Sequence, residues 1–82
     1  MTRLRLLGRH DCELCEELHA VMAGDPVLCG YGIDRVDLDD VPALRERYQY
    51  SIPVVLTDDD SEIWAGPATE STLVHIKAAL AG

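Results

Sequence analysis

Two cysteines separated by two residues, Cys12 and Cys15, are the side chains of this 82-residue chain best suited to chemistry. They lie in the segment RHDCELCE (residues 9–16), directly after the apolar run 4–7 and Gly8. Thiols at this spacing can form and break a disulfide when the first lies at the exposed start of a helix and the second one turn inside it. The helix N-terminus favours negative charge and so stabilises a Cys12 thiolate. The segment therefore predicts thiol–disulfide exchange.

In such an exchange Cys12 is the expected nucleophile, which forms a mixed disulfide that Cys15 then attacks to release the reduced partner. Opposing charges act on the Cys12 thiol. The helix N-terminus, Arg9 and His10 lower its pKa, and the acids around it raise its pKa. These acids are Asp11, Glu13, Glu16 and Glu17. We expect the pKa of Cys12 to be lowered by a modest amount.

A metal site is the first alternative for the same segment. Its donors are His10, Cys12, Cys15 and His19, in the pattern H-x-C-x2-C-x3-H. Zinc binds two thiolates and two imidazoles tetrahedrally, and an iron–sulfur cluster that joins two chains through Cys12 is a variant. Against this interpretation, a regular helix start cannot easily aim all four side chains of one ten-residue segment at one ion.

Composition limits the partners. The formal net charge is −8, with 7 basic and 15 acidic residues, which argues against nucleic acid because binding to phosphates needs clusters of Lys and Arg. No run approaches the ~20 apolar residues of a membrane span. The apolar stretch at the N-terminus is too short, and too interrupted by polar residues, for a signal peptide. We expect a cytoplasmic monomer without membrane contact. A second alternative function is an interaction module of little redox activity, in which the acidic surface is the functional part.

Three cysteines cannot all pair within one chain, so a disulfide framework is not expected. In a reducing compartment a C-x-x-C pair near a β-α-β pattern is more often catalytic or metal-binding than structural. Cys29 is expected to be a small buried apolar residue or a surface thiol outside the mechanism.

The periodicity of the chain predicts one domain, residues 1–82, with the element order β-α-β-α-β-β-α. The predicted strands are 3–8, 33–38, 51–56 and 62–65. Asp11 is the expected N-cap of the first helix, whose apolar face is expected to be formed by Leu14, Leu18, Val21 and Met22. A short helix is predicted over 43–48, and a last helix carries Leu73, Ile76 and Leu80. This is an α/β fold with one mixed sheet and helices on both faces.

The C-x-x-C between a first strand and a first helix, followed by Ile-Pro-Val-Val (52–55) at the entry to a hairpin, resembles the thioredoxin superfamily. The chain length and Arg9, three residues before Cys12, are most similar to glutaredoxins, and Cys-Glu-Leu-Cys-Glu-Glu (12–17) is similar to small glutaredoxin-like bacterial proteins. The resemblance implies a thioredoxin-like, glutaredoxin-type fold with a four-stranded sheet of order 2-1-3-4. It also implies a dithiol–disulfide oxidoreductase.

The resemblance further implies a cis peptide bond at Pro53, beside Cys12, and a substrate paired with the backbone of Ile52. The implied substrate-binding residues are Arg9, Ile52, Pro53 and Gly66. Arg9 would meet a carboxylate of glutathione, and Gly66 lies in the segment 65–69 that partly matches the glutathione-binding turn of glutaredoxins. Glutathione is thus a candidate cosubstrate, with no bound cofactor or metal expected. The expected partner is a disulfide-containing protein or a small thiol.

This chain also departs from the glutaredoxin pattern. Glu13 and Leu14 stand between the cysteines, where these families usually have Pro-Tyr or Gly-Pro. Glutathione is anionic, and the acids around Cys12 oppose its approach.

Overall fold

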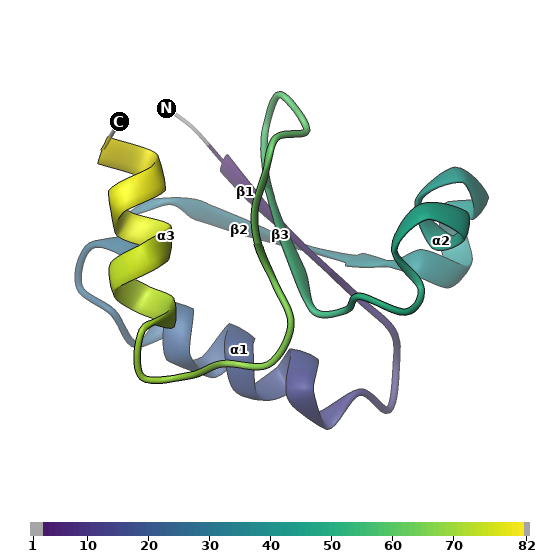
Figure 1. Cartoon of the computed structure of the whole chain (residues 1–82), viewed down its shortest axis with the longest axis horizontal. Helices are drawn as coiled ribbons and strands as arrows, with labels where there is room; N and C mark the ends of the chain where they lie inside the picture. The colour runs from purple at the N-terminus through teal and green to yellow at the C-terminus, as the bar shows by residue number, and fades with distance from the viewer. Residues whose placement is uncertain (1–2, 82) are drawn as a thin grey trace.

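The computed structural model describes residues 3–81, which form one four-stranded sheet with helices on both faces (Figure 1). The strands are β1 (Arg3–Gly8), β2 (Gly32–Asp37), β3 (Val54–Thr57) and β4 (Glu62–Ala65). The α-helices are α1 (Glu13–Ala23), α2 (Pro42–Tyr48) and α3 (Thr72–Ala81), and the 3-10 helices are η1 (Leu28–Gly30) and η2 (Leu38–Asp40). The predicted order of strands and helices is confirmed.

The sheet order is β2-β1-β3-β4, as the resemblance implied. β1 and β2 are parallel and joined through α1, whereas β3 is antiparallel to both β1 and β4. Gly8 pairs with Asp37, Leu7 pairs with Val54, and Val54 pairs with Ala65. The last residues of β1, β2 and β4 and the first residue of β3 therefore lie at one end of the sheet. We call it the Gly8 end, and the segment that carries the two cysteines leaves from it.

Two apolar layers enclose the sheet. Leu4 and Leu6 of β1 face α1 and α3, and Leu7 faces the opposite side, where α2 packs. The alternation follows from the two-residue period of a strand. Residues buried on the side of α1 and α3 include Leu18, Met22, Leu28, Val55 and Ile76, and those on the side of α2 are Leu38, Tyr48, Val54 and Leu56. Leu73 and Leu80 of α3 pack against the first layer, as predicted.

The buried face of α1 differs from the predicted one. Cys15, Leu18 and Met22 are fully buried, whereas Leu14 and Val21 are 43% and 38% exposed. The predicted assignment of Leu14 and Val21 to the buried face is wrong because Cys15, a small apolar side chain when uncharged, takes the core position one turn before Leu18. The second cysteine is therefore part of the core.

The bounds of β2 and β3 also differ from the prediction. β3 begins at Val54, because Pro53 has no N–H to donate to the neighbouring strand. β2 ends at Asp37, whose carboxylate accepts a hydrogen bond from the Asp39 N–H at 2.9 Å. This bond caps η2, so Leu38 begins a helical turn instead of extending the strand. No helix among residues 3–81 is both long enough and apolar enough to span a membrane.

Asp25 joins the end of α1 to α3. Its carboxylate is buried, accepts hydrogen bonds from the N–H groups of Val27 and Leu28 at 2.9 and 3.0 Å, and lies 2.9 Å from Nζ of Lys77. The hydrogen bond from Lys77, followed by that from Leu28, lowers the pKa of Asp25. Folding therefore favours the ionised form of this carboxyl.

We expect Asp25→Asn to lower the free energy of unfolding near neutral pH. Because the folded-state pKa of Asp25 lies below its ordinary value of 3.8, its contribution is present above about pH 4 and is lost as the pH falls through the folded-state value. Urea denaturation of both proteins at pH 7 and at several values below pH 4 measures the difference, which should shrink in acid. Asp58→Asn, at an exposed position, is the control. An equal difference at every pH would contradict this assignment.

Candidate redox site

Cys12 and Cys15 form a disulfide at the start of α1, with their Cα atoms 5.3 Å apart. Cys12 is the N-cap residue of this helix. Its Sγ lies 3.1 Å from the Cys15 nitrogen and accepts the hydrogen bond from that N–H group, and its carbonyl accepts one from the Glu16 N–H. The prediction that Asp11 caps the helix is therefore wrong. Asp11 has a left-handed backbone (φ 62°), and its carboxylate lies 3.7 Å from the His10 ring.

The two sulfurs differ in exposure. Cys12 is half-buried at the surface, whereas Cys15 is fully buried. Cys15 packs directly on Gly8, where an added Cβ would lie 2.8 Å from the Cys15 Sγ and 3.0 Å from its Cβ. Only a residue without a side chain lets α1 approach the end of β1 this closely. One reachable sulfur and one sheltered sulfur suit a nucleophile and a resolving thiol.

We expect Gly8→Ala to displace the start of α1, because the new methyl group would overlap Cys15. Overpacking of this kind typically costs about 1–3 kcal/mol of stability. Thermal unfolding of the oxidised protein measures that loss, and the equilibrium of the Cys12–Cys15 disulfide with a thiol buffer measures the effect on the site. Gly30→Ala, at a glycine whose added Cβ would meet nothing within 4 Å, is the matched control. Equal changes in both variants would show that the contact with Cys15 has no special role.

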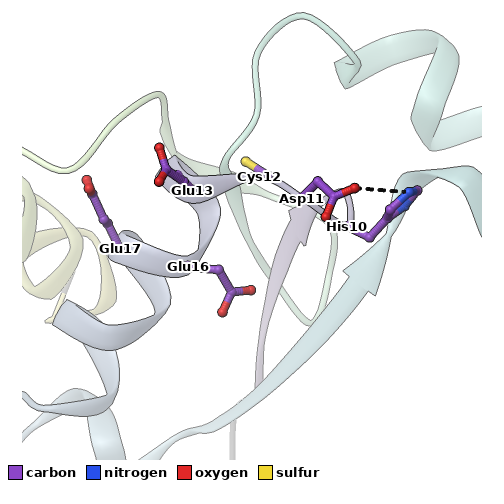
Figure 2. A pocket seen from close by; sticks show the side chains of 6 residues that line it. All are labelled: His10, Asp11, Cys12, Glu13, Glu16 and Glu17. Atoms are coloured by element: carbon purple, nitrogen blue, oxygen red, sulfur yellow. Dashed lines mark ion pairs between the residues drawn. The ribbon is translucent and has the colours of Figure 1, made fainter.

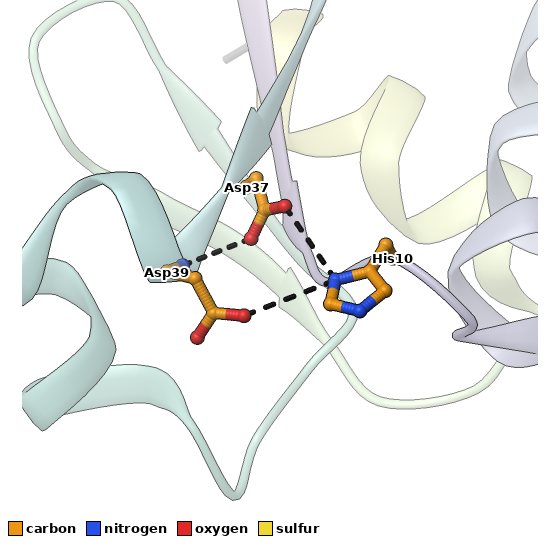
Figure 3. A group of neighbouring side chains, drawn as sticks. All are labelled: His10, Asp37 and Asp39. Atoms are coloured by element: carbon orange, nitrogen blue, oxygen red, sulfur yellow. Dashed lines mark hydrogen bonds and ion pairs between the residues drawn. The ribbon is translucent and has the colours of Figure 1, made fainter.

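Polar contacts hold the loop before Cys12 at the Gly8 end. Figure 3 shows the His10 ring facing both Asp37 and Asp39, with its Nδ1 3.9 Å from a carboxylate oxygen of each. The Arg9 guanidinium lies 3.1 Å from Asp39, and Arg45 of α2 lies 4.0 Å from it. Both residues that begin the loop are thus attached to the end of β2 and to η2.

The alternative metal site is not assembled in this structure. Three or more His, Cys, Asp or Glu side chains whose ligand atoms lie within 4.8 Å of one another could hold a metal ion. Within residues 3–81 the only such group is His10, Asp37 and Asp39. Cys12 and Cys15 are bonded to each other, and His10 points toward β2. The Asp39 carboxylate already faces Arg9, and one oxygen of Asp37 accepts a hydrogen bond from the Asp39 N–H. Both carboxylates therefore already have partners within the chain.

The implied substrate-binding residues lie at the Gly8 end of the sheet, where Arg9 directly follows Gly8. The Ile52–Pro53 peptide bond is cis. The Gly66 N–H donates to the Pro53 carbonyl at 2.8 Å, and the Gly66 carbonyl accepts from the Trp64 indole at 2.9 Å. The strand register places Pro53 and Gly66 at the same end of the sheet as Gly8. The Arg9 side chain pairs with Asp39 and lines a depression with residues of α2 that does not include Cys12. Its role toward substrate stays a prediction.

A pocket opens beside the Cys12 sulfur, and acids line most of it. Its lining residues are His10, Asp11, Cys12, Glu13, Glu16 and Glu17. In Figure 2 the Glu13 and Glu17 side chains project to the side of α1 on which the Cys12 sulfur is drawn, and Glu16 projects away from it. Glu16 contacts Arg35 of β2 at 2.5 Å, and this hydrogen bond and the charge of Arg35 lower the pKa of Glu16.

The third cysteine, Cys29, is exposed in η1 and forms no disulfide within the described residues. Of the two predicted environments, the structure shows the surface thiol.

Sequence reasoning missed three contributors to the site. Gly8 provides the surface on which Cys15 packs, Asp39 anchors the loop through Arg9, and Arg35 neutralises one of the acids near Cys12. A glycine that ends a strand just before a C-x-x-C segment was a visible signal for the first. The other two pairs join residues 30 and 19 positions apart, and no local pattern marks them.

Comparison with known proteins agrees with this geometry. Residues 3–79 match the model of the glutaredoxin-like domain family (DUF836), and the chain belongs to this family. A comparison with curated proteins gives no match.

Solved structures show the same fold. A protein from X. campestris, XcR50, is 26% identical with a TM-score of 0.72, over 93% of this chain and 96% of the other. Protein Ne2328 from Nitrosomonas europaea is 25% identical with a TM-score of 0.70, over 89% and 86% of the two chains. Thioredoxin 1 from Thermosipho africanus TCF52B, at 15% identity and a TM-score of 0.61 over 96% and 91%, shares the fold. The fold is thioredoxin-like, with a close cysteine pair that fits a redox role.

Proposed function

We propose that this protein is a dithiol–disulfide oxidoreductase. The observation that carries the proposal is the bond between Cys12, half-buried at the helix N-cap, and Cys15, fully buried one turn inside the helix. Cys12 also lines an open pocket, from which a substrate disulfide can reach its sulfur. Membership of the glutaredoxin-like family supports the same conclusion.

The reaction starts from the reduced protein. The Cys12 thiolate attacks one sulfur of a substrate disulfide, forms a mixed disulfide and expels the first substrate thiolate. Cys15, which gives up its proton, then attacks the Cys12 sulfur and expels the second substrate thiolate. Two electrons pass from the protein to the substrate, and the two protons lost by the cysteines end on the two product thiols. The protein finishes in the disulfide form that the structure shows.

The hydrogen bond at the helix N-cap favours the charged form of Cys12. The N–H of Cys15 already points at this sulfur from 3.1 Å, so it is placed to stabilise a thiolate once the disulfide opens. The acids of the pocket oppose this effect through their charge. A less stabilised thiolate makes the disulfide a weaker oxidant, so the proposed direction of reaction is reduction of the substrate. The reaction needs no bound cofactor, and glutathione is a candidate cosubstrate.

Three serine variants test the roles of the cysteines. We expect Cys12→Ser to abolish reduction of a small disulfide, and Cys15→Ser to stop at the mixed disulfide, because its second sulfur is missing. Cys29→Ser should react like the unmodified protein. Thiol release and intact-mass spectrometry of the prereduced proteins measure both stages. Equal rates for Cys12→Ser and the unmodified protein would overturn the proposal and favour the interaction module.

The difference in burial predicts which thiol is reactive. In the reduced protein near pH 7, iodoacetamide should modify Cys12 before Cys15, because Cys15 lies in the core against Gly8. Peptide mapping after a short pulse of reagent measures the two rates, with Cys29→Ser as the background so that the exposed third thiol does not interfere. Faster modification of Cys15 would contradict the assignment of the nucleophile.

A further inference from the structure

The acids around the disulfide divide into paired and unpaired groups. Asp11 lies near His10, and Glu16 is paired with Arg35. Glu13 and Glu17 are exposed, and neither carboxylate lies within 4.0 Å of a basic group in the part of the chain that the structure describes. They are four residues apart on α1 and therefore share one face, and both line the pocket beside the Cys12 sulfur. The surface that a substrate must approach thus carries uncompensated negative charge.

The basic residues near the Gly8 end do not offset this charge. Arg9 and Arg45 are directed at Asp39, and together they line a depression that does not include Cys12. Arg35 is directed at Glu16. An incoming anion would therefore meet Glu13 and Glu17 without a free guanidinium beside Cys12.

We propose that Glu13 and Glu17 are specificity-determining residues that select disulfides with positive charge beside the sulfur–sulfur bond. This inference rests on the proposed function, since it concerns the substrate of the same two cysteines. A cationic group on the substrate is attracted to the pair of carboxylates while its disulfide reaches Cys12, and an anionic disulfide such as oxidised glutathione is repelled. Charges that line a cleft of one sign typically change association rates by about 10-fold to 1,000-fold at low ionic strength.

Positive charge can come from a small molecule or from a protein segment rich in Lys or Arg. Leu14 lies between the two cysteines and is 43% exposed, so it offers an apolar contact that an extended peptide can use. Cystamine and a Lys-flanked disulfide peptide present the same charge, and only the peptide can also cover Leu14. Comparing them separates the two sources.

The test is a single-turnover measurement with the prereduced protein, which supplies both electrons itself. The probes are cystamine, hydroxyethyl disulfide and oxidised glutathione, together with two peptides that differ only in Lys or Glu beside the disulfide. We expect cationic probes to react about tenfold faster than anionic ones at low salt. The ratio should fall toward one in 1 M salt, where the screening length is only about 3 Å.

Variants assign the effect to named residues. Glu13→Gln with Glu17→Gln should reduce the cationic-to-anionic ratio several-fold, and Arg35→Gln should increase it by leaving Glu16 uncompensated. The control is Asp58→Asn with Glu62→Gln, which removes the same charge from exposed positions at the opposite end of the sheet. Dividing each rate by that of hydroxyethyl disulfide removes any change in the reactivity of Cys12 itself.

The outcomes separate the two proposals. If no probe reacts, including the neutral one, the proposed redox function fails. If the neutral probe reacts but the ratio is near one at low salt, the redox function stands and the selectivity is overturned. The selectivity is also overturned if the control variant lowers the cationic-to-anionic rate ratio as much as the Glu13 and Glu17 variant does. Net charge alone would then explain the preference.

Discussion

The contact between Cys15 and Gly8 is the constraint on which the site depends. It lets α1 begin almost against the end of β1, because no side chain separates the two backbones. Cys15 is at the same time part of the buried face of the helix with Leu18 and Met22. The position of the Cys15 sulfur is therefore set by core packing, which tolerates little displacement. The disulfide, together with the hydrogen bond that the Cys12 sulfur accepts, then determines the position of Cys12.

Around this contact, the fold uses its charges in two ways. Some acids are paired: Asp39 faces Arg9, and Glu16 faces Arg35, and these contacts attach the start of the site to β2 and η2. Others, Glu13 and Glu17, are left to solvent beside the reachable sulfur. Exposed ion pairs contribute little to stability, commonly about 0–1 kcal/mol, so their main effect here is geometric. The unpaired acids act instead on what approaches the sulfur.

Local patterns predicted most of the secondary structure because the strands alternate with a two-residue period and the helices repeat at three and four residues. They failed where a tertiary contact outweighed a local preference. Asp11 has a good side chain for capping a helix, but the chain turns through a left-handed conformation there, and the sulfur of Cys12 accepts the N–H group instead. Leu14 is apolar and correctly spaced, but Cys15 occupies the core position near it.

By itself, the sequence determined the order of strands and helices, the pair of cysteines at a strand-to-helix junction and the acidic character of their surroundings. These depend on residue type and spacing, which are local properties. Only the tertiary structure decided which sulfur is sheltered, which acids are neutralised and which loops meet at the Gly8 end. Those outcomes depend on the register of β1 with β2 and β3 and on contacts such as that of Arg35 with Glu16, between residues far apart along the chain. Such pairings arise when the sheet assembles, and no short stretch of residues encodes them.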